Sequence, residues 1–493
     1  MIDKLKQLSK ETVIYGISTV VGRFLNFVLV PFYSNIFAPD EMGVVANLYA
    51  YMAIFNIVFI YGMDSALLKV STLPEYRGTK KVFTTSYITV FTTGAVFSLI
   101  LYLLMPYLGV SISVNPEFAA KYQHLISYSI NILFLDALSV LPFIVLRLEN
   151  KAFTFSMIRL INIVINIGLN FVLILIFKMK IEAVFFANLI ASAFSFLALL
   201  PITYSNLSFE FDFGVLKRLM KFGLPFLPAG LAAMVMQVVD KPIVERLTNI
   251  EKLGIYNANY KLGVFMMLFV SMFQFAWQPF FLQHADDDDA RDLFAKVFTY
   301  FTIVGSLILV FLTIFIEDIT SLGVGRIHFL GEAFWSGRNI IPVILLGYLF
   351  YGFYVNFNAS FYIKEKSIPV PILLGIGAIS NIVLNYLLVP QFELMGAAFA
   401  TLISYMLIAI GFFYYGRRLF EINYEYRKVG TLLLLIGVVF VIYYTLIDGA
   451  NVSLFVKILF AAAYPAALVL LRVVTPREVT VIKSTILRKV RGR

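Results

Sequence analysis

Long apolar runs, separated by short polar segments, follow one another along the whole chain. Each run is close to the length of about 20 residues that a helix needs to cross the hydrocarbon core of a bilayer. Backbone N–H and C=O groups in lipid must be paired within their own segment, so these runs predict helices. None shows the alternation of polar and apolar residues that is typical of a membrane β-barrel strand. We therefore predict an all-α polytopic membrane protein.

Fourteen membrane-spanning helices account for this pattern, and the loops that join them are too short for a folded domain outside the membrane. The first run is too long for the apolar part of a signal peptide, and no small-residue cleavage site follows it, so we expect it to stay as a span. The expected spans are 12–36, 43–66, 82–108, 122–146, 153–177, 182–203, 222–245, 254–282, 293–316, 333–362, 368–389, 394–416, 429–446 and 453–472.

One stretch of the sequence occurs twice. Pro31–Gly43 lies over Pro242–Gly254 without a gap, with proline on proline, Asp40 on Glu251 and glycine on glycine. Each copy is an apolar segment, a short polar turn and a second apolar segment. Two similar hydrophobic halves are typical of a membrane transporter.

Two further pairs of segments repeat in the same order. Asn166–Leu173 matches Asn381–Leu388, and Ala183–Ile190 matches Gly396–Ile403. Spans 1–6 and 7–12 are therefore expected to form two similar lobes. Because six is an even number, both lobes begin on the same side of the membrane, which makes the repeat parallel. The predicted parts are an N-terminal lobe at 1–208, a C-terminal lobe at 209–420, and two additional helices with a basic tail at 421–493.

Positive charge is distributed unevenly between alternate loops. Most of the 39 lysine and arginine residues fall on segments that share one side of the membrane. Cytoplasmic loops carry such an excess, so we predict a multi-pass protein of the inner (plasma) membrane with both termini in the cytoplasm. The net charge of +10 and the basic tail after Arg472 are then explained by anionic lipid. No nucleic-acid partner is expected.

Composition excludes several kinds of site. The chain is 60% hydrophobic and 14% charged, whereas an average soluble domain is about a quarter charged. It has no cysteine, which excludes disulfides, thiolate metal sites and cysteine nucleophiles. The three histidines lie in or near loops, and the run Asp286–Asp289 is typical of a solvated acidic loop. We predict no metal, no cofactor and no catalytic residue.

Charged residues inside spans are costly in lipid, so each of them is a candidate for function. Arg23 lies near the middle of the first span, on one polar stripe with Thr19 and Asn26. It has no acidic residue at matching depth in its own span or its neighbours. We interpret Arg23 as facing substrate, with hydrogen bonding between spans as the alternative.

Five more charged residues are singled out well inside predicted spans: Asp136, Arg159, Asp240, Lys241 and Lys261. In one interpretation they neutralise one another as ion pairs, Asp136 with Arg159 and Asp240 with Lys241 or Lys261, because buried charges usually pair. In the other, the cations face an anionic substrate and the carboxylates couple transport to an ion. Lys457, near a span end, is expected to reach the membrane interface.

Two sequence patterns suggest structural roles. The asparagines spaced by four in spans 5 and 11 are expected to hold helices together rather than to touch substrate. Gly223–Gly230, with two prolines and two glycines, predicts either a hinge at the start of span 7 or an ordinary helix start.

The order and spacing of several short motifs resemble those of Wzx-type polysaccharide flippases, which belong to the multidrug/oligosaccharidyl-lipid/polysaccharide (MOP) exporter superfamily. The similarity covers essentially the whole length. The motifs that carry it are Gly22–Arg23, Phe37–Gly43, Gly62–Asp64, Asp240–Lys241, Leu253–Lys261, Asn381 with Asn385, and Gly396–Ala398.

The resemblance implies two six-helix lobes around a central cavity, with two further helices. It implies transfer of undecaprenyl-pyrophosphate-linked oligosaccharide to the outer leaflet, for lipopolysaccharide or O-antigen assembly, with other polysaccharide-assembly proteins as further candidate partners. Cavity cations are implied to receive the pyrophosphate. The residues carried over are Arg23, Lys261, Lys241, Arg159 and Asn26 for substrate binding, and Asp240 and Asp136 for ion coupling.

The sign of the charges inside the spans and the shortness of the loops favour this interpretation over two alternatives. A pyrophosphate that enters a low-dielectric cavity must be met by cations, whereas a multidrug/cation antiporter of the same superfamily would present unpaired carboxylates. Basic groups outnumber acidic ones inside the spans. A membrane-embedded polysaccharide polymerase or ligase would need a large outer loop with catalytic residues, which the predicted spans do not leave. We therefore predict a transporter and not an enzyme.

Overall fold

The structure, a computed structural model, describes residues 27–76, 79–111, 115–208, 210–366, 368–450 and 452–474. Helices make up nearly all of this part of the chain. The strands described are β1 (Gly323–Val324) and β2 (Ile327–His328), which form a short antiparallel hairpin. The prediction of an all-α membrane fold is confirmed.

The described residues pack as two compact units. The first consists of those up to Lys261, with Leu330–Ser336 and Pro371–Ser404 added. Its helices are α2 (Pro39–Ile60), α3 (Met63–Val70), α4 (Lys81–Leu104), η1 (Met105–Ser111), α5 (Pro116–Tyr122), α6 (His124–Leu148), α7 (Ala152–Phe171), η2 (Val172–Ile176), α8 (Glu182–Asn206), α9 (Phe213–Gly223), α10 (Phe226–Val238), α11 (Asp240–Leu247) and α12 (Ile250–Tyr260).

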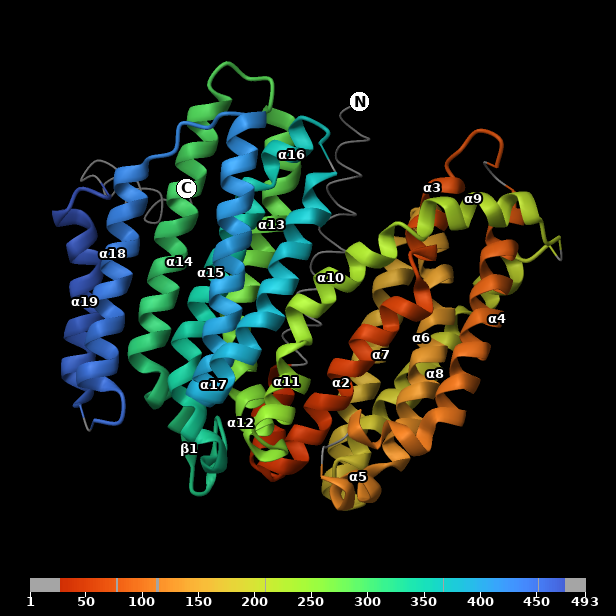
Figure 1. Cartoon of the computed structure of the whole chain (residues 1–493), viewed down its shortest axis with the longest axis horizontal. Helices are drawn as coiled ribbons and strands as arrows, with labels where there is room; N and C mark the ends of the chain where they lie inside the picture. The colour runs from red at the N-terminus through yellow and green to blue at the C-terminus, as the bar shows by residue number, and fades with distance from the viewer. Residues whose placement is uncertain are drawn as a thin grey trace, which may run out of the picture. The chain divides into compact units, whose positions relative to one another are not determined.

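The second unit contains the hairpin and the later helices, which run side by side (Figure 1). Three helical segments, η3 (Lys261–Gly263), η4 (Glu332–Ile340) and α17 (Pro369–Leu419), have residues in both units. The remaining helices are α13 (Val264–His284), α14 (Ala290–Ser321), α15 (Ile341–Phe357), α16 (Ala359–Ile363), α18 (Tyr426–Ile442), η5 (Tyr443–Ile447) and α19 (Leu454–Leu470). The predicted lobe boundaries at 208 and 420 stay a prediction.

Ten helices in the described part of the chain are long and apolar enough to cross a membrane, and an eleventh results if α9 and α10 are one bent span. α17 corresponds to two predicted spans, 368–389 and 394–416. They meet at Glu393, whose φ of 49° and ψ of −124° are not helical. Most of the first predicted span, 12–36, lies outside the described residues. The structure describes this span from residue 27, and residues 27–34 are helical. The chain is a multi-pass membrane protein, and the count of fourteen spans is compatible with these helices.

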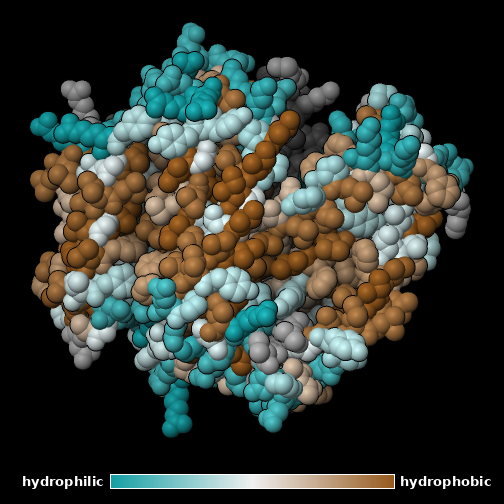
Figure 2. All heavy atoms as spheres, in the orientation of Figure 1, coloured by the Kyte–Doolittle hydropathy of each residue, from teal (hydrophilic) through white to brown (hydrophobic). Residues whose placement is uncertain are grey.

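Hydrophobic side chains cover the flanks of the helices on the visible face, and hydrophilic ones gather at the helix ends (Figure 2). This distribution is the one that a bilayer selects, because apolar flanks contact lipid tails and polar ends contact water and headgroups. Leu103 and Phe177 are examples of large apolar side chains that are more than half exposed.

Within the first unit, α2, α4, α6, α7 and α8 pack against one another, and α9 runs across the ends of α3 and α4 (Figure 1). Phe143 and Leu146 of α6 form a buried cluster with Phe155 of α7 and Leu199 of α8. α2 also packs along α12, so the two copies of the duplicated stretch lie against each other.

The repeated asparagines have the same local geometry in both copies. Asn170 Nδ2 donates to the Asn166 carbonyl oxygen at 2.8 Å, and Asn385 Nδ2 donates to the Asn381 carbonyl oxygen at 2.8 Å. Each second asparagine also donates to the side-chain oxygen of the first, at 3.2 and 3.1 Å respectively. The sequence match therefore reflects a structural match.

In the second unit, Lys457 of α19 is buried against the end of α14. It is 3% exposed, and its Nζ lies 2.7 Å from Asp318 Oδ2 and 3.4 Å from Glu317 Oε2, both at the end of α14. Two carboxylates in the last turn of a neighbouring helix compensate the charge of Lys457. The expectation that Lys457 reaches the membrane interface stays a prediction.

Candidate functional site

A cavity of about 400 Å³ opens within the first unit. Residues 27–34 and helices α2, α7, α8, α10, α11 and α12 supply its walls. Its volume lies in the usual range for small-molecule pockets, about 300–1,000 Å³. The lining residues are Leu29, Tyr33, Val45, Ala46, Tyr49, Ala50, Asn162, Ile163, Asn166, Val184, Asn188, Val238, Lys241, Asn257 and Lys261.

The cavity contains two of the predicted cations. Lys241 of α11 is held in place, because its Nζ donates to the Gln237 carbonyl oxygen at 3.1 Å and lies 4.7 Å from the centre of the Tyr260 ring. The side chain of Lys261, which follows α12, makes no ion pair or hydrogen bond with any residue that the structure describes. One cation is therefore compensated and the other is available.

Asp240 compensates Lys241. Its Oδ1 lies 3.4 Å from Lys241 Nζ, and its Oδ2 accepts a hydrogen bond from the Tyr256 hydroxyl at 2.6 Å. The carboxylate is 3% exposed and does not line the cavity. The predicted ion pair of Asp240 with Lys241 is present in the structure.

The opposite wall is polar but uncharged. Asn188 of α8 donates to the Tyr49 hydroxyl of α2 at 3.0 Å. Asn162 of α7 donates to the Ala191 carbonyl oxygen at 2.7 Å and to Ser195 Oγ at 2.9 Å. The Tyr33 hydroxyl donates to Asn170 Oδ1 at 2.6 Å. Every lining residue is neutral or basic, and no carboxylate is among them.

The predicted pair of Asp136 and Arg159 is not formed. Asp136 of α6 interacts with the Ser192 hydroxyl, and no ion pair within 4.0 Å joins it to Arg159. The Arg159 guanidinium instead lies 4.8 Å from the centre of the Phe155 ring and 5.2 Å from that of Phe143. These aromatic faces attract the cation in place of a carboxylate, so the expectation of an ion pair was wrong. Neither Asp136 nor Arg159 lines the cavity.

Arg23 and Asn26, the predicted substrate-binding residues of the first span, lie outside the described residues. The part of that span which the structure describes contributes Leu29 and Tyr33 to the cavity wall. Their roles stay predictions.

Sequence reasoning missed two asparagines of the cavity and assigned another to packing. Asn162 and Asn188 are uncharged, so a search for charged residues inside spans does not find them. A signal was present, however, because Asn162, Asn166 and Asn170 are spaced by four and therefore share one face of α7. Asn166 lines the cavity as well as contacting Asn170.

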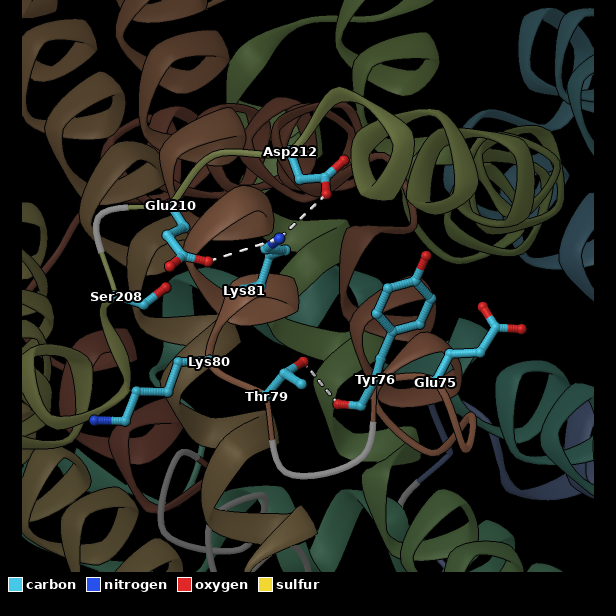
Figure 3. Close-up of a pocket in the computed structure, with 8 residues that line it drawn as sticks. All are labelled: Glu75, Tyr76, Thr79, Lys80, Lys81, Ser208, Glu210 and Asp212. Atoms are coloured by element: carbon cyan, nitrogen blue, oxygen red, sulfur yellow. Dashed lines mark hydrogen bonds and ion pairs between the residues drawn. The ribbon is translucent and has the colours of Figure 1, made fainter.

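A second pocket, of about 430 Å³, lies where the segment between α8 and α9 meets the start of α4 (Figure 3). Lys81 stands between two carboxylates there, 3.6 Å from Glu210 and 3.5 Å from Asp212. Backbone N–H groups of Val215 and Gly214 hold the pKa of Asp212 below its usual value, with Lys81 adding to the effect. The ion pairs of Lys81 attach the segment between α8 and α9 to the start of α4.

Comparison with known proteins gives consistent results. A family model described as "Polysaccharide biosynthesis protein" matches residues 34–326. The structure of the lipid II flippase MurJ in an inward closed conformation has a TM-score of 0.70 at 17% identity, covering 98% of this chain and 100% of that chain. A multidrug resistance MATE family transporter of the MOP superfamily, in an inward-facing conformation, has a TM-score of 0.66 at 14% identity, covering 84% and 96%.

A MOP superfamily transporter from Pyrococcus furiosus, described as having a binding pocket of reverse polarity, has a TM-score of 0.54 at 14% identity, covering 86% of this chain and 96% of that chain. No curated protein sequence matches the chain. Likeness at these identities shows a shared fold.

Proposed function

Since the chain belongs to the polysaccharide biosynthesis protein family and has the fold of MOP superfamily transporters, we propose that it is a lipid flippase. Its substrate is undecaprenyl-pyrophosphate-linked oligosaccharide. The protein carries this lipid by alternating access from the cytoplasmic to the outer leaflet of the inner membrane, with both of its own termini in the cytoplasm.

The observation that carries this proposal is the charge of the cavity. Lys261 lines it without a partner among the described residues, and no carboxylate lines it. An unpaired cation at a site with little water is unfavourable unless a ligand supplies the opposite charge. A pyrophosphate does so, because its oxygens accept strong charge-assisted hydrogen bonds.

We assign the receiving role to Lys261 and a fixed supporting role to Lys241. Arg23 and Asn26 of the first span are proposed to complete the phosphate site. Arg159 is proposed to act outside the cavity, where its guanidinium rests on aromatic rings. Asp240 and Asp136 are the proposed groups for coupling to a proton or cation gradient, because both are carboxylates on helices of the first unit and neither lines the cavity.

A multidrug antiporter of the same fold receives less support. Such a protein would meet a cationic drug with a free carboxylate, and here Asp240 is occupied by Lys241 and Tyr256. The Pyrococcus furiosus relative is described as having a pocket of reverse polarity that suggests a different function. Pocket charge therefore differs between transporters of this fold, and the basic cavity here favours an anionic substrate.

The test is leaflet transfer in liposomes. Purified protein is reconstituted with a fluorescent undecaprenyl-pyrophosphate-linked oligosaccharide, and the fraction accessible to a membrane-impermeant quencher is followed with time. We expect Lys261→Gln and Arg23→Ala each to slow transfer about tenfold or more, the equivalent of about 1.4 kcal/mol. Lys296→Gln, at an exposed position of α14, is the matched control. Wild-type protein that moves no lipid-linked sugar but exports cationic dyes would overturn the proposal.

A further inference from the structure

The uncharged wall of the cavity has hydrogen-bonding capacity that the residues described by the structure do not use. We call it the amide wall and define it as Tyr33, Tyr49, Asn162, Asn166 and Asn188. We propose that the amide wall binds the sugar attached directly to the pyrophosphate, and that it selects substrates by the hydroxyl groups of that sugar. This inference rests on the proposed function and names the part of the substrate that sets specificity.

The contacts within the amide wall leave both donors and acceptors available. The Asn162 side-chain nitrogen donates both of its hydrogen bonds to α8, to the Ala191 carbonyl oxygen and to Ser195 Oγ. Its side-chain oxygen accepts from no residue that the structure describes. Asn188 donates to the Tyr49 hydroxyl, so the Asn188 oxygen can still accept and the Tyr49 O–H can still donate.

The second part of the amide wall is similar. Tyr33 donates to Asn170, and Asn170 donates to the side-chain oxygen of Asn166. The Asn166 amide nitrogen is then an unused donor, and the Tyr33 oxygen keeps a lone pair that can accept. Among the described residues, the amide wall thus offers donors and acceptors together and carries no charge.

This mixture selects for one kind of ligand. A phosphate group accepts hydrogen bonds and so needs donors on the protein, whereas a cation needs acceptors. A hydroxyl group donates and accepts at once, and several hydroxyls on one ring match a surface that has both. The lysine side of the cavity therefore fits the pyrophosphate, and the amide wall fits a neutral sugar.

The amide wall is also fixed before any ligand binds. The Tyr49 ring stacks on Phe185 with centroids 5.3 Å apart, and the Tyr33 ring stacks on Phe37 with centroids 5.3 Å apart. Asn162 is tied to α8 through Ala191 and Ser195. Groups that are already in place lose little conformational entropy on binding, so they discriminate well between similar ligands.

Size identifies which sugar is bound. The cavity of about 400 Å³ contains both Lys261 and the amide wall, and this volume is near the lower end of the range for small-molecule pockets, about 300–1,000 Å³, so it does not hold a whole oligosaccharide. When the pyrophosphate is at the lysines, the sugar that reaches the amide wall is the one bonded to it. A site built to hydrogen-bond a hydroxyl leaves its own polar groups unpaired when that hydroxyl is absent, and so rejects the wrong ligand.

The experiment compares two lipids in the liposome transfer assay. One is undecaprenyl pyrophosphate without sugar, and the other carries a single hexose on the pyrophosphate. Transfer rates over a range of lipid content give a kcat/KM for each, and their ratio measures sugar selection. For the wild type we expect a ratio of about ten or more in favour of the lipid with the sugar.

The variants are Tyr49→Phe and Asn166→Leu, which lie on different helices and so test the amide wall independently. We expect each to lower the ratio at least about threefold, because transfer of the lipid with the sugar slows more than transfer of the bare lipid. Tyr51→Phe is the matched control, because it removes a tyrosine hydroxyl from the same helix at a residue that lines a different pocket. Lys261→Gln should slow both lipids equally and keep the ratio.

The outcomes separate the inference from the proposed function. A wild type that moves both lipids equally well, or wall variants that keep the wild-type ratio, would overturn the inference and leave the flippase proposal standing. A wild type that moves neither lipid would overturn the flippase proposal itself. Melting temperatures of the purified variants identify any that fail to fold, and the variant on the other helix then decides.

Discussion

Gly43 of α2 and Gly254 of α12 meet where these two helices cross. A Cβ atom on Gly254 would overlap the Pro39 carbonyl oxygen and lie 2.9 Å from the Gly43 backbone nitrogen, and a Cβ atom on Gly43 would overlap the Ile250 carbonyl oxygen. The two glycines occupy the same position of the duplicated stretch. Glycine in both copies lets the backbones touch, as small residues do at close helix crossings in membranes.

This crossing fixes the distance between the two sides of the cavity, because α2 carries Tyr49 and α12 leads into Lys261. We expect Gly254→Ala to push the helices apart, to destabilise the protein by about 1–3 kcal/mol, and to slow lipid transfer. Thermal unfolding in detergent and the liposome assay measure the two effects. Gly168→Ala is the control, since a Cβ atom at this helical position would meet nothing within 4 Å.

An equal melting temperature for Gly254→Ala and Gly168→Ala would show that the crossing tolerates a side chain, and that it does not hold the two sides of the cavity at a fixed distance.

Two ion pairs flank this crossing, and their charges are reversed between the copies. Glu41 of α2 pairs with Lys180 at 2.8 Å, and Lys252 of α12 pairs with Glu393 at 2.5 Å. Position 41 aligns with 252, and 180 aligns with 393. The hydrogen bond to Glu41 raises the pKa of Lys180 above its ordinary value. Each pair ties the first turn of a helix to the segment between two later helices.

The reversal has a local cause. Glu41 Oε2 also accepts from the Ala38 backbone N–H at 3.3 Å, which caps the start of α2. In the second copy the Asn249 side chain caps α12 by accepting from the Lys252 N–H at 2.8 Å. Because Asn249 caps α12 with its own side chain, position 252 does not need the acidic side chain that Glu41 provides for α2.

We therefore predict that Lys180→Glu, which places two carboxylates together, destabilises the protein by about 0.5–1 kcal/mol. The double variant Glu41→Lys/Lys180→Glu should recover only part of this loss, because it removes the cap. Adding Ala38→Asn, in imitation of the second copy, should recover the rest. Chemical or thermal unfolding checks the order, and a double variant as stable as the wild type would contradict the capping role of Glu41.

Much of the fold follows from the sequence, because helix length and apolarity in lipid leave few alternatives. The expected span 122–146 corresponds to α6 (His124–Leu148), and 182–203 corresponds to α8 (Glu182–Asn206). Breaks inside spans were harder to predict. The expected span 254–282 covers most of α12, the short η3 and most of α13. Hydrophobicity reports burial in lipid and not a change in helical geometry.

The site was predicted in part for a similar physical reason. Charge inside a span is conspicuous in a sequence, so Lys241 and Lys261 were predicted and the structure brings them into one cavity. Whether such a charge is compensated depends on contacts between helices. Lys241 has Asp240 beside it, whereas Arg159 rests on aromatic rings that no spacing rule indicates. Neutral groups such as Asn188 carry still less signal.

The segment that joins α8 to α9 is attached to α4. Thr84 Oγ1 accepts from the Ser208 N–H at 3.0 Å, and Thr85 Oγ1 accepts from the Asp212 N–H at 3.2 Å. Lys81 pairs with two carboxylates of the same segment (Figure 3). We infer that α9 moves together with α4, and that bending occurs after it, where α9 and α10 meet at 40°.

Spin labels test this arrangement. With labels at Ile88 of α4 and Lys217 of α9, we expect the distance distribution to stay constant when lipid-linked oligosaccharide is added. With labels at Lys217 and Gln237, on either side of the bend, we expect it to shift. A shift in the first pair alone would place the hinge before α9, at the attached segment.

The cap of α9 gives a prediction about pH. Asp212 Oδ1 accepts from the Gly214 N–H at 2.7 Å and the Val215 N–H at 3.1 Å, and these bonds lower its pKa. Because the pKa of Asp212 is lower in the folded than in the unfolded protein, its ionised carboxylate stabilises the fold. This stabilisation is fully present at a pH above the unfolded pKa, about 3.9, and is lost as the pH falls through the lower pKa of the folded protein. Amide exchange at Gly214 and Val215 should stay protected at pH 4. Asp212→Ala should remove the protection at every pH, and equal exchange in both proteins would contradict the cap.

The two lysines of the cavity should respond to substitution in opposite ways. Lys241 is compensated by Asp240, so Lys241→Met leaves that carboxylate without a cation, with the Tyr256 hydroxyl and the backbone N–H of residue 241 as its remaining partners. We expect a loss of about 1–3 kcal/mol in stability together with slower transfer. Lys261 has no partner among the described residues, so Lys261→Met removes an uncompensated charge. This variant should melt at a higher temperature than the wild type and yet transfer less lipid, because groups held for function often cost stability.

The double variant Asp240→Asn/Lys241→Met completes the comparison, since it removes both charges of the pair and should regain most of the stability lost in Lys241→Met. A melting temperature for Lys261→Met below that of the wild type would mean that Lys261 is compensated within the protein. Its charge would then need no phosphate to neutralise it, and the assignment of Lys261 as the residue that binds the pyrophosphate would be wrong.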